Sequence, residues 1–159
     1  MATEPRRIIV DRRLVEDAWQ PVADDAPLPD GPVIVSRQRW LSGALAGRTE
    51  VGARYRPDED PMEDVERLGE LAVIALEFPA FSDGRPLSRA RKLRQIAGFH
   101  GQIRAVGDVL RDQILYMWRC GFDAFEVRAD KSPEDALAAF AEFSVDYQAA
   151  TPRRIAEPG

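Results

Sequence analysis

The sequence predicts a single α/β domain in which about five parallel strands alternate with helices. Three short apolar runs, at 72–78, 103–106 and 124–127, are separated by two segments whose apolar residues recur at helical spacing. Continuous runs rich in Val, Ile and Leu are typical of strands buried on both faces, and strand–helix repetition is typical of a parallel sheet. With 159 residues, the chain is long enough to bury a core without a metal or a disulfide.

The N-terminal part of the chain predicts a β element and then a loop. Residues 6–11 and 18–22 have the composition of two short strands joined by a charged turn, and we expect them to form a hairpin at the edge of the main sheet. Residues 24–32 contain three prolines and a glycine, which is typical of a loop because proline removes a backbone donor and fixes φ.

Two strand–helix units are predicted before the central apolar runs. Residues 33–35 have the pattern of a buried strand, and Ser36 is placed to cap a helix that ends near Gly47. The next strand, 51–56, precedes a second helix start with Asp60 as its N-cap and a proline at the first helical position.

The C-terminal part predicts one more helix over 133–143, a short strand at 145–147 and a loose tail over 151–159. The single domain is thus expected to span residues 1–150. Five strand–helix units are too few to close an eight-stranded barrel, so an open sheet, an incomplete TIM-like barrel and completion by a partner subunit, as in a homo-oligomer, are all compatible with the pattern.

Charge and cysteine content exclude several classes of protein. The net charge is −5, but residues 85–119 alone carry +6, which leaves −11 for the rest. A basic segment on an acidic protein predicts a small anion or a local partner rather than nucleic acid; the alternative is that these side chains only solvate two helix faces. Cys120 is the only cysteine, which excludes an intrachain disulfide and a thiolate zinc cluster.

The chain carries no apolar run long enough to span a bilayer and begins without the pattern of a secretory signal. We therefore expect a cytoplasmic protein that has no membrane partner. The sequence also lacks a dinucleotide-binding fingerprint, a phosphate-cradling loop and a Cys-x-x-Cys pair, and it predicts no metal site.

Polar residues gather where the strand over 72–78 is predicted to end. Asp83 and Arg85 flank a glycine there, and Ser88 is placed to cap the helix that follows. Unpaired N–H groups at a helix start, together with Arg85 and Arg89, would bind phosphate, sulfate, sulfite or carboxylate. The alternative is a plain turn followed by arginines that cover the helix.

A second polar group follows the strand over 103–106. Asp108 is placed to cap the next helix, and Asp112 lies one turn further on, beside Arg111. Two carboxylates can act as acid and base, although pairing with arginine lowers a carboxylate pKa and favours a structural role. His100 and Cys120 are predicted to lie away from this edge of the sheet.

The carboxyl ends of parallel strands meet at one edge of a sheet, so we expect these loops to line one pocket. The candidate catalytic residues are Asp83, Asp108 and Asp112, and the candidate anion-binding residues are Arg85, Ser88, Arg89, Arg111 and Arg128.

Three long motifs resemble the bacterial family of unknown function DUF934. They read LEFPAFSDGR at 76–85, RAVGDVLRDQ at 104–113 and RCGFDAF at 119–125, and the likeness extends over about 32–148. The resemblance implies a link to assimilatory sulfate and sulfite reduction, where members are named as probable oxidoreductases. Sulfite reduction requires haem, iron–sulfur, flavin or nicotinamide groups, and nothing in this sequence resembles a site for any of them, so the cofactor is left open.

The expected function is therefore that of an accessory protein in this pathway, which binds a sulfur oxyanion or the sulfite reductase through an arginine-rich face. The alternative is a small enzyme that acts on an anionic sulfur or phosphate metabolite with Asp and Arg groups. A third hypothesis is nucleotide or flavin binding at the sheet edge without a recognisable fingerprint.

Overall fold

An eight-stranded sheet runs through the part of the chain that the computed structural model describes, residues 6–80, 83–127 and 132–141. The strands are β1 (Arg7–Val10), β2 (Arg13–Glu16), β3 (Gln20–Pro21), β4 (Val33–Ser36), β5 (Val51–Tyr55), β6 (Val73–Phe78), β7 (Gln102–Gly107) and β8 (Ala124–Phe125). The helices are α1 (Arg37–Leu41), the 3₁₀ helix η1 (Pro61–Glu70), α2 (Arg85–Gln95), α3 (Arg111–Cys120) and α4 (Pro133–Ala141).

The sheet is mixed and open. Its strand order is β2-β1-β8-β7-β6-β5-β4-β3, in which β3 to β8 pair in parallel and β1 pairs antiparallel with both neighbours. Within the described residues β2 and β3 are its two edges and do not pair with each other. The predicted α/β class and the N-terminal β element are confirmed, but the sheet is a mixed one of eight strands rather than one of about five parallel strands, because β1 and β2 join it antiparallel.

The N-terminal hairpin differs from the predicted one. Asp11 and Arg12 both have positive φ, 51° and 65°, and form the two-residue turn that joins β1 to β2. The partner of β1 is therefore 13–16 and not 18–22. The predicted second strand contributes β3, which pairs with β4 at the opposite edge of the sheet.

Two predicted helices also differ in length or type. Ser36 is the N-cap of α1, as predicted, and accepts a hydrogen bond from the Arg39 backbone at 3.1 Å, but the helix ends at Leu41. Asp60 caps η1 through the Met62 backbone, yet this segment is a 3₁₀ helix with a break at Asp64. The strand and tail predicted over 145–147 and 151–159 lie outside the described residues.

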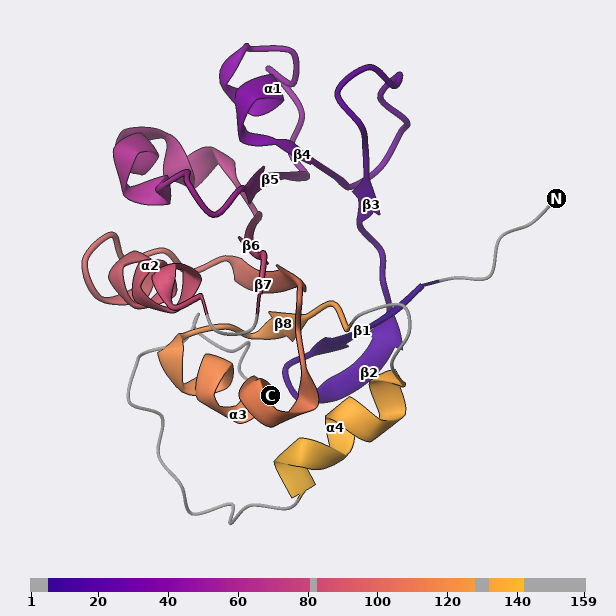
Figure 1. Cartoon of the computed structure of the whole chain (residues 1–159). Helices are drawn as coiled ribbons and strands as arrows, with labels where there is room; N and C mark the ends of the chain where they lie inside the picture. The colour runs from indigo at the N-terminus through magenta and orange to yellow at the C-terminus, as the bar shows by residue number, and fades with distance from the viewer. Residues whose placement is uncertain (1–5, 81–82, 128–131, 142–159) are drawn as a thin grey trace, which may run out of the picture.

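Figure 1 shows the strands following one another along an arc, with the helices on the convex side. The alternation along β6 follows this division, since Ile74, Leu76 and Phe78 join the large core that includes side chains from the helices. Val73 and Ala75 point to the opposite, concave face, where they form a smaller cluster with side chains from β4 and β7. The helices of the described residues therefore lie on the convex face and leave the concave face to the strands.

The chain between β2 and β3 joins the two edges of the arc (Figure 1). We call residues 17–19 the strap. Trp19 packs against the small apolar cluster of the concave face, and the Asp17 carboxylate accepts hydrogen bonds from Arg104 at 2.8 and 3.1 Å. The Asp17 and Arg104 side chains are both 1% exposed. A buried ion pair thus links the strap to β7. The strap connects the two edge strands of the sheet, β2 and β3, which do not pair with each other.

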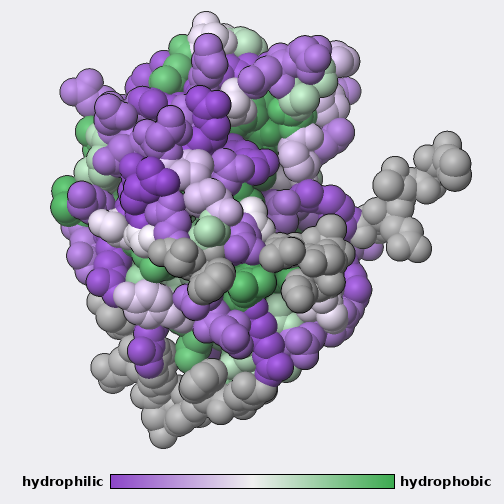
Figure 2. Space-filling model, in the orientation of Figure 1, coloured by the Kyte–Doolittle hydropathy of each residue, from purple (hydrophilic) through white to green (hydrophobic). Residues whose placement is uncertain are grey.

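On the face shown in Figure 2, hydrophilic residues cover most of the surface and hydrophobic residues lie in small separate groups. No helix among the described residues combines the length and the apolar character that crossing a membrane would require. This surface gives no sign of an extended apolar patch on the side in view.

Candidate functional site

Asp83 and Arg85 pair with each other at the start of α2. The Asp83 carboxylate accepts hydrogen bonds from the Arg85 backbone at 2.9 Å and from its guanidinium at 2.6 Å. The hydrogen bonds and the charge of Arg85 lower the pKa of Asp83. Arg85 is thus already neutralised by a carboxylate from its own turn.

Ser88 does not cap this helix, contrary to the prediction. The helix begins at Arg85 with Gly84 in the capping position, because the Asp83 turn and Pro86 start the helix earlier. Ser88 therefore lies inside the first turn, and its backbone N–H donates to the Gly84 carbonyl at 3.3 Å.

Arg89, one turn into the same helix, donates a hydrogen bond to the Pro57 carbonyl and so links α2 to the loop after β5. Because the acceptor is a neutral backbone carbonyl, this contact holds the Arg89 guanidinium without neutralising its charge. Its role in anion binding stays a prediction.

Asp108 is not the N-cap of α3, which begins at Arg111 with Leu110 before it. The Asp108 backbone N–H instead donates to the Phe78 carbonyl at 2.8 Å and so continues the pairing of β6 with β7. The preceding Gly107 has φ of +90°, and this turn delays the start of the helix.

Arg111 and Asp112 share a cavity of about 260 Å³ between the starts of α3 and α4. Ser132 and Asp135 also line this cavity, and Arg111 forms an ion pair with Asp135 at 3.4 Å. Apart from Asp108, the predicted residues within the described part of the chain therefore fall into two groups, one at the start of α2 and one between α3 and α4. Arg128 lies outside the described residues, so the shared pocket stays a prediction.

Side chains from several strands converge on another cavity, in the concave face, which we call the mouth pocket. Its volume is about 300 Å³, at the lower end of the range for small-molecule sites. Its lining includes Asp24, Ile34, Ser36, Arg54, Val106 and Glu126. Ser36 and Arg54 are cross-strand partners near the carboxyl ends of β4 and β5, so the pocket opens where ligands meet parallel strands.

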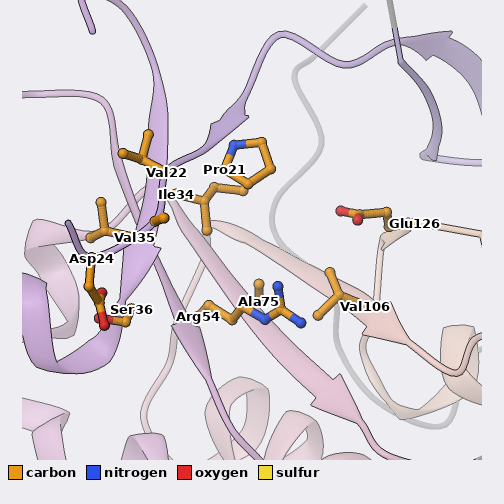
Figure 3. A pocket seen from close by; sticks show the side chains of 11 residues that line it. Pro21, Val22, Asp24, Ile34, Val35, Ser36, Arg54, Ala75, Val106 and Glu126 are labelled. Carbon is orange, nitrogen blue, oxygen red and sulfur yellow. The ribbon is translucent and has the colours of Figure 1, made fainter. Parts of the chain in front are cut away.

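Opposite charges line different walls of the mouth pocket (Figure 3). Figure 3 shows the Arg54 side chain extending past Ala75 toward Val106, and the Glu126 carboxylate pointing into the same space from the side of β8. Arg54 donates a short hydrogen bond to Glu77, at 2.7 Å, whereas the two hydrogen bonds that Glu126 accepts from Arg6 are long, at 3.4 Å. The pocket therefore presents both a cation and a carboxylate to its interior.

A second cavity of about 240 Å³ adjoins the mouth pocket, with Asp24, Ser36 and Arg54 shared between the two. Arg56 and Glu59, which follow β5, also line it. The Ser36 hydroxyl donates to Asp24 at 2.6 Å and accepts from the Arg39 backbone, so it acts as a helix cap. We call this second space the outer cavity.

Sequence reasoning missed the mouth pocket, although one signal for it is present. Arg54 and Arg104 each interrupt an otherwise apolar strand, VGARY and QIRAVG. Because side chains alternate along a strand, a single arginine in such a run indicates a second face where its charge has partners. The part of the chain that the structure describes holds no group of three or more His, Cys, Asp or Glu side chains able to bind a metal.

Fold and site together define an α/β protein with a curled open sheet and a small charged pocket at the carboxyl ends of its strands. The chain belongs to the DUF934 family, described as a bacterial protein of unknown function, whose model matches residues 52–156. The matched region includes Arg54, Glu77 and Glu126. No curated protein and no solved structure matches the chain.

Proposed function

We propose that the protein is an accessory protein of assimilatory sulfate and sulfite reduction that binds a small metabolite in the mouth pocket. The observation that carries the proposal is the convergence of Arg54 and Glu126 on one cavity at the carboxyl ends of the strands. In parallel sheets, open or closed, this is the end at which ligands bind. The pathway comes from the resemblance to DUF934, and the curled sheet resembles an incomplete TIM-like barrel.

The mouth pocket is a better ligand site than the arginine-rich start of α2. Arg85 makes three guanidinium hydrogen bonds to Asp83, which the Arg85 backbone also holds, so an oxyanion there would have to displace this carboxylate. Arg54 is also paired, but among the described residues its guanidinium makes one hydrogen bond, to Glu77. The mouth pocket instead has a shaped cavity with an apolar floor, which is typical of metabolite sites. The proposal also includes a second binding function, in which the α2 arginines bind the sulfite reductase.

A small enzyme is the second candidate function. Arg111, Asp112 and Asp135 line one cavity, and a carboxylate beside an arginine can transfer a proton to or from an anionic sulfur or phosphate metabolite. Asp112→Asn combined with Asp135→Asn tests it, because an activity that survives both changes would exclude acid–base chemistry by the carboxylates of this cavity.

Thermal unfolding of the full chain with sulfite, sulfate and sulfur-containing amino acids tests metabolite binding. A ligand at about 100 times its Kd should raise Tm by roughly 5–10 °C, because only the folded state binds it. Arg54→Gln should abolish the shift. Arg7→Gln is the matched control, since Arg7 pairs with Glu134 and does not line the mouth pocket. Absence of any shift, together with failure to co-purify with sulfite reductase, would contradict the proposal.

A further inference from the structure

We propose that the mouth pocket takes a small zwitterion with an apolar side chain, such as an α-amino acid. This inference rests on the proposed function, since it names the class of metabolite for the same pocket. It depends on three features of the concave face: the balance of charges around the cavity, the positions of Arg54 and Glu126, and the apolar floor between them.

The charges around the cavity disfavour a ligand with net negative charge. The mouth pocket and the outer cavity together are lined by two guanidinium groups, Arg54 and Arg56, and by four carboxylates, Asp24, Glu59, Glu77 and Glu126. Arg6 and Arg104 lie beside Glu126 and share the carboxylate of Asp17, so carboxylates still outnumber guanidinium groups when these three residues are included. A sulfate or sulfite dianion would add negative charge beside these carboxylates, and like charges in proximity are costly. A ligand that carries one charge of each sign avoids this repulsion.

Arg54 is suited to the carboxylate of such a ligand. Its side chain is 44% exposed, and among the described residues Glu77 is the one hydrogen-bond partner of its guanidinium. A guanidinium has five N–H donors and binds carboxylates in a fork geometry, so donors are left for a ligand.

Glu126 is suited to the ammonium group. Its carboxylate is 32% exposed and points into the cavity (Figure 3). The hydrogen bonds from Arg6 are long, 3.4 Å each, and Arg104 is 3.9 Å away, so the carboxylate keeps acceptor capacity. An ammonium group would supply the shorter, charge-assisted bond that these arginines do not make.

The floor between the two charged groups is apolar. Ile34, Ala75 and Val106 line the cavity and belong to the cluster that Trp19 covers from the strap. An apolar side chain on the ligand would bury surface there, which favours binding. The cavity of about 300 Å³ restricts the ligand to a size well below that of a dinucleotide.

Isothermal titration calorimetry with L-methionine and two analogues tests the class of ligand. One analogue lacks the amino group and the other lacks the carboxylate, so each removes one of the two proposed contacts. The wild-type protein should bind L-methionine at least about tenfold more tightly than either analogue, because each contact is a hydrogen bond between charged groups. This comparison needs no substitution and does not depend on the folding of a variant.

Two variants assign the contacts to residues. Arg54→Gln should weaken L-methionine binding about tenfold but leave the affinity for the analogue without a carboxylate unchanged. Glu126→Gln should also weaken L-methionine binding about tenfold, but it should leave the affinity for the analogue without an amino group unchanged. Arg7→Gln and Glu134→Gln, which break an ion pair between β1 and α4 away from this pocket, should change neither affinity.

Equal affinity for L-methionine and the analogue without a carboxylate would overturn the inference, since a plain cation would then suffice. Sulfate or sulfite binding that depends on Arg54, without binding of L-methionine, would also overturn it but would leave the proposed function standing. If neither an oxyanion nor an amino acid binds, both the inference and metabolite binding by the mouth pocket are contradicted.

Discussion

The substitution Asp17→Asn tests whether the strap is held to the concave face by its buried ion pair. Asp17 accepts hydrogen bonds from Arg104 at 2.8 and 3.1 Å, from Arg6 at 2.6 Å and from the Trp19 backbone at 3.0 Å. Asparagine keeps the size of the side chain but places an N–H₂ donor or a neutral oxygen against two guanidinium groups. Removing one partner of a buried ion pair costs about 3–5 kcal/mol, so we expect the free energy of unfolding to fall by about 3 kcal/mol.

Urea unfolding followed by circular dichroism and tryptophan fluorescence measures this loss. For a chain of this size, a loss of about 3 kcal/mol corresponds to a fall in Tm of roughly 6–12 °C. The control is Glu134→Gln, which breaks the Arg7–Glu134 pair, whose side chains are 49% and 53% exposed. Exposed pairs contribute little, so this variant should unfold like the wild type. A loss below about 1 kcal/mol in Asp17→Asn would contradict the role given to the strap.

Asp17 also predicts how stability depends on pH. Burial alone would raise its pKa, but the hydrogen bonds and charges of Arg104 and Arg6 outweigh burial and lower it in the folded state. Asp17 therefore contributes fully to the free energy of unfolding above the ordinary carboxyl pKa of about 4, and this contribution is lost as the pH falls through the lowered pKa of the folded state. Between about pH 5 and pH 2, the wild type should lose more stability than Asp17→Asn. Equal losses would contradict this account.

Two other contacts give predictions that urea unfolding can check. Gly107→Ala should lower the free energy of unfolding by more than about 1 kcal/mol, because φ is +90° and a Cβ would lie 2.4 Å from the Phe78 carbonyl oxygen. Gly31→Ala is the control, since Gly31 has a similar φ of +93° but open space around it, and it should lose less stability. Equal losses would exclude the steric cause. Tyr55→Phe should cost about 1.5 kcal/mol, because the hydroxyl donates to Asp64 at 2.6 Å. Burial and Asp64 raise the pKa of Tyr55, so the tyrosinate absorbance that appears before alkaline unfolding should be equal in the wild type and in Tyr55→Phe, and a smaller signal in the variant would contradict this.

Local sequence signals predicted the strands and two helix caps. The apolar runs mark β6, β7 and β8, and Ser36 and Asp60 cap the helical segments that follow β4 and β5, because both signals involve residues close in the chain. Where two local signals competed, the prediction failed. Asp83 starts α2 before Ser88 can cap it, and the strand pairing of the Asp108 backbone delays α3.

The curled sheet and its strap could not be predicted in this way. Asp17 and Arg104 lie 87 positions apart, and they meet because β2 pairs with β1, β1 with β8 and β8 with β7. No pattern within one element carries that information. The interruption of β7 by Arg104 predicts only that a partner for its charge exists.

The basic segment 85–119 shows why local net charge is a poor guide to a binding surface. Arg94 is 6% exposed and donates to the carbonyl groups of Phe99, Gly101 and Gly121. Arg104 is buried against Asp17, so two of the seven arginines stabilise the interior rather than the surface.

Other arginines of the segment are also engaged within the protein. Arg85 pairs with Asp83, Arg89 donates to the Pro57 carbonyl, and Arg111 pairs with Asp135. A ligand attracted by the +6 charge of this segment would meet guanidinium groups that already have partners. Arg54 and Glu126 have partners as well, but they line one cavity with an apolar floor between them. Opposite charges on separate walls of a cavity are therefore the stronger evidence, and in this molecule they direct the search for a ligand to Arg54 and Glu126.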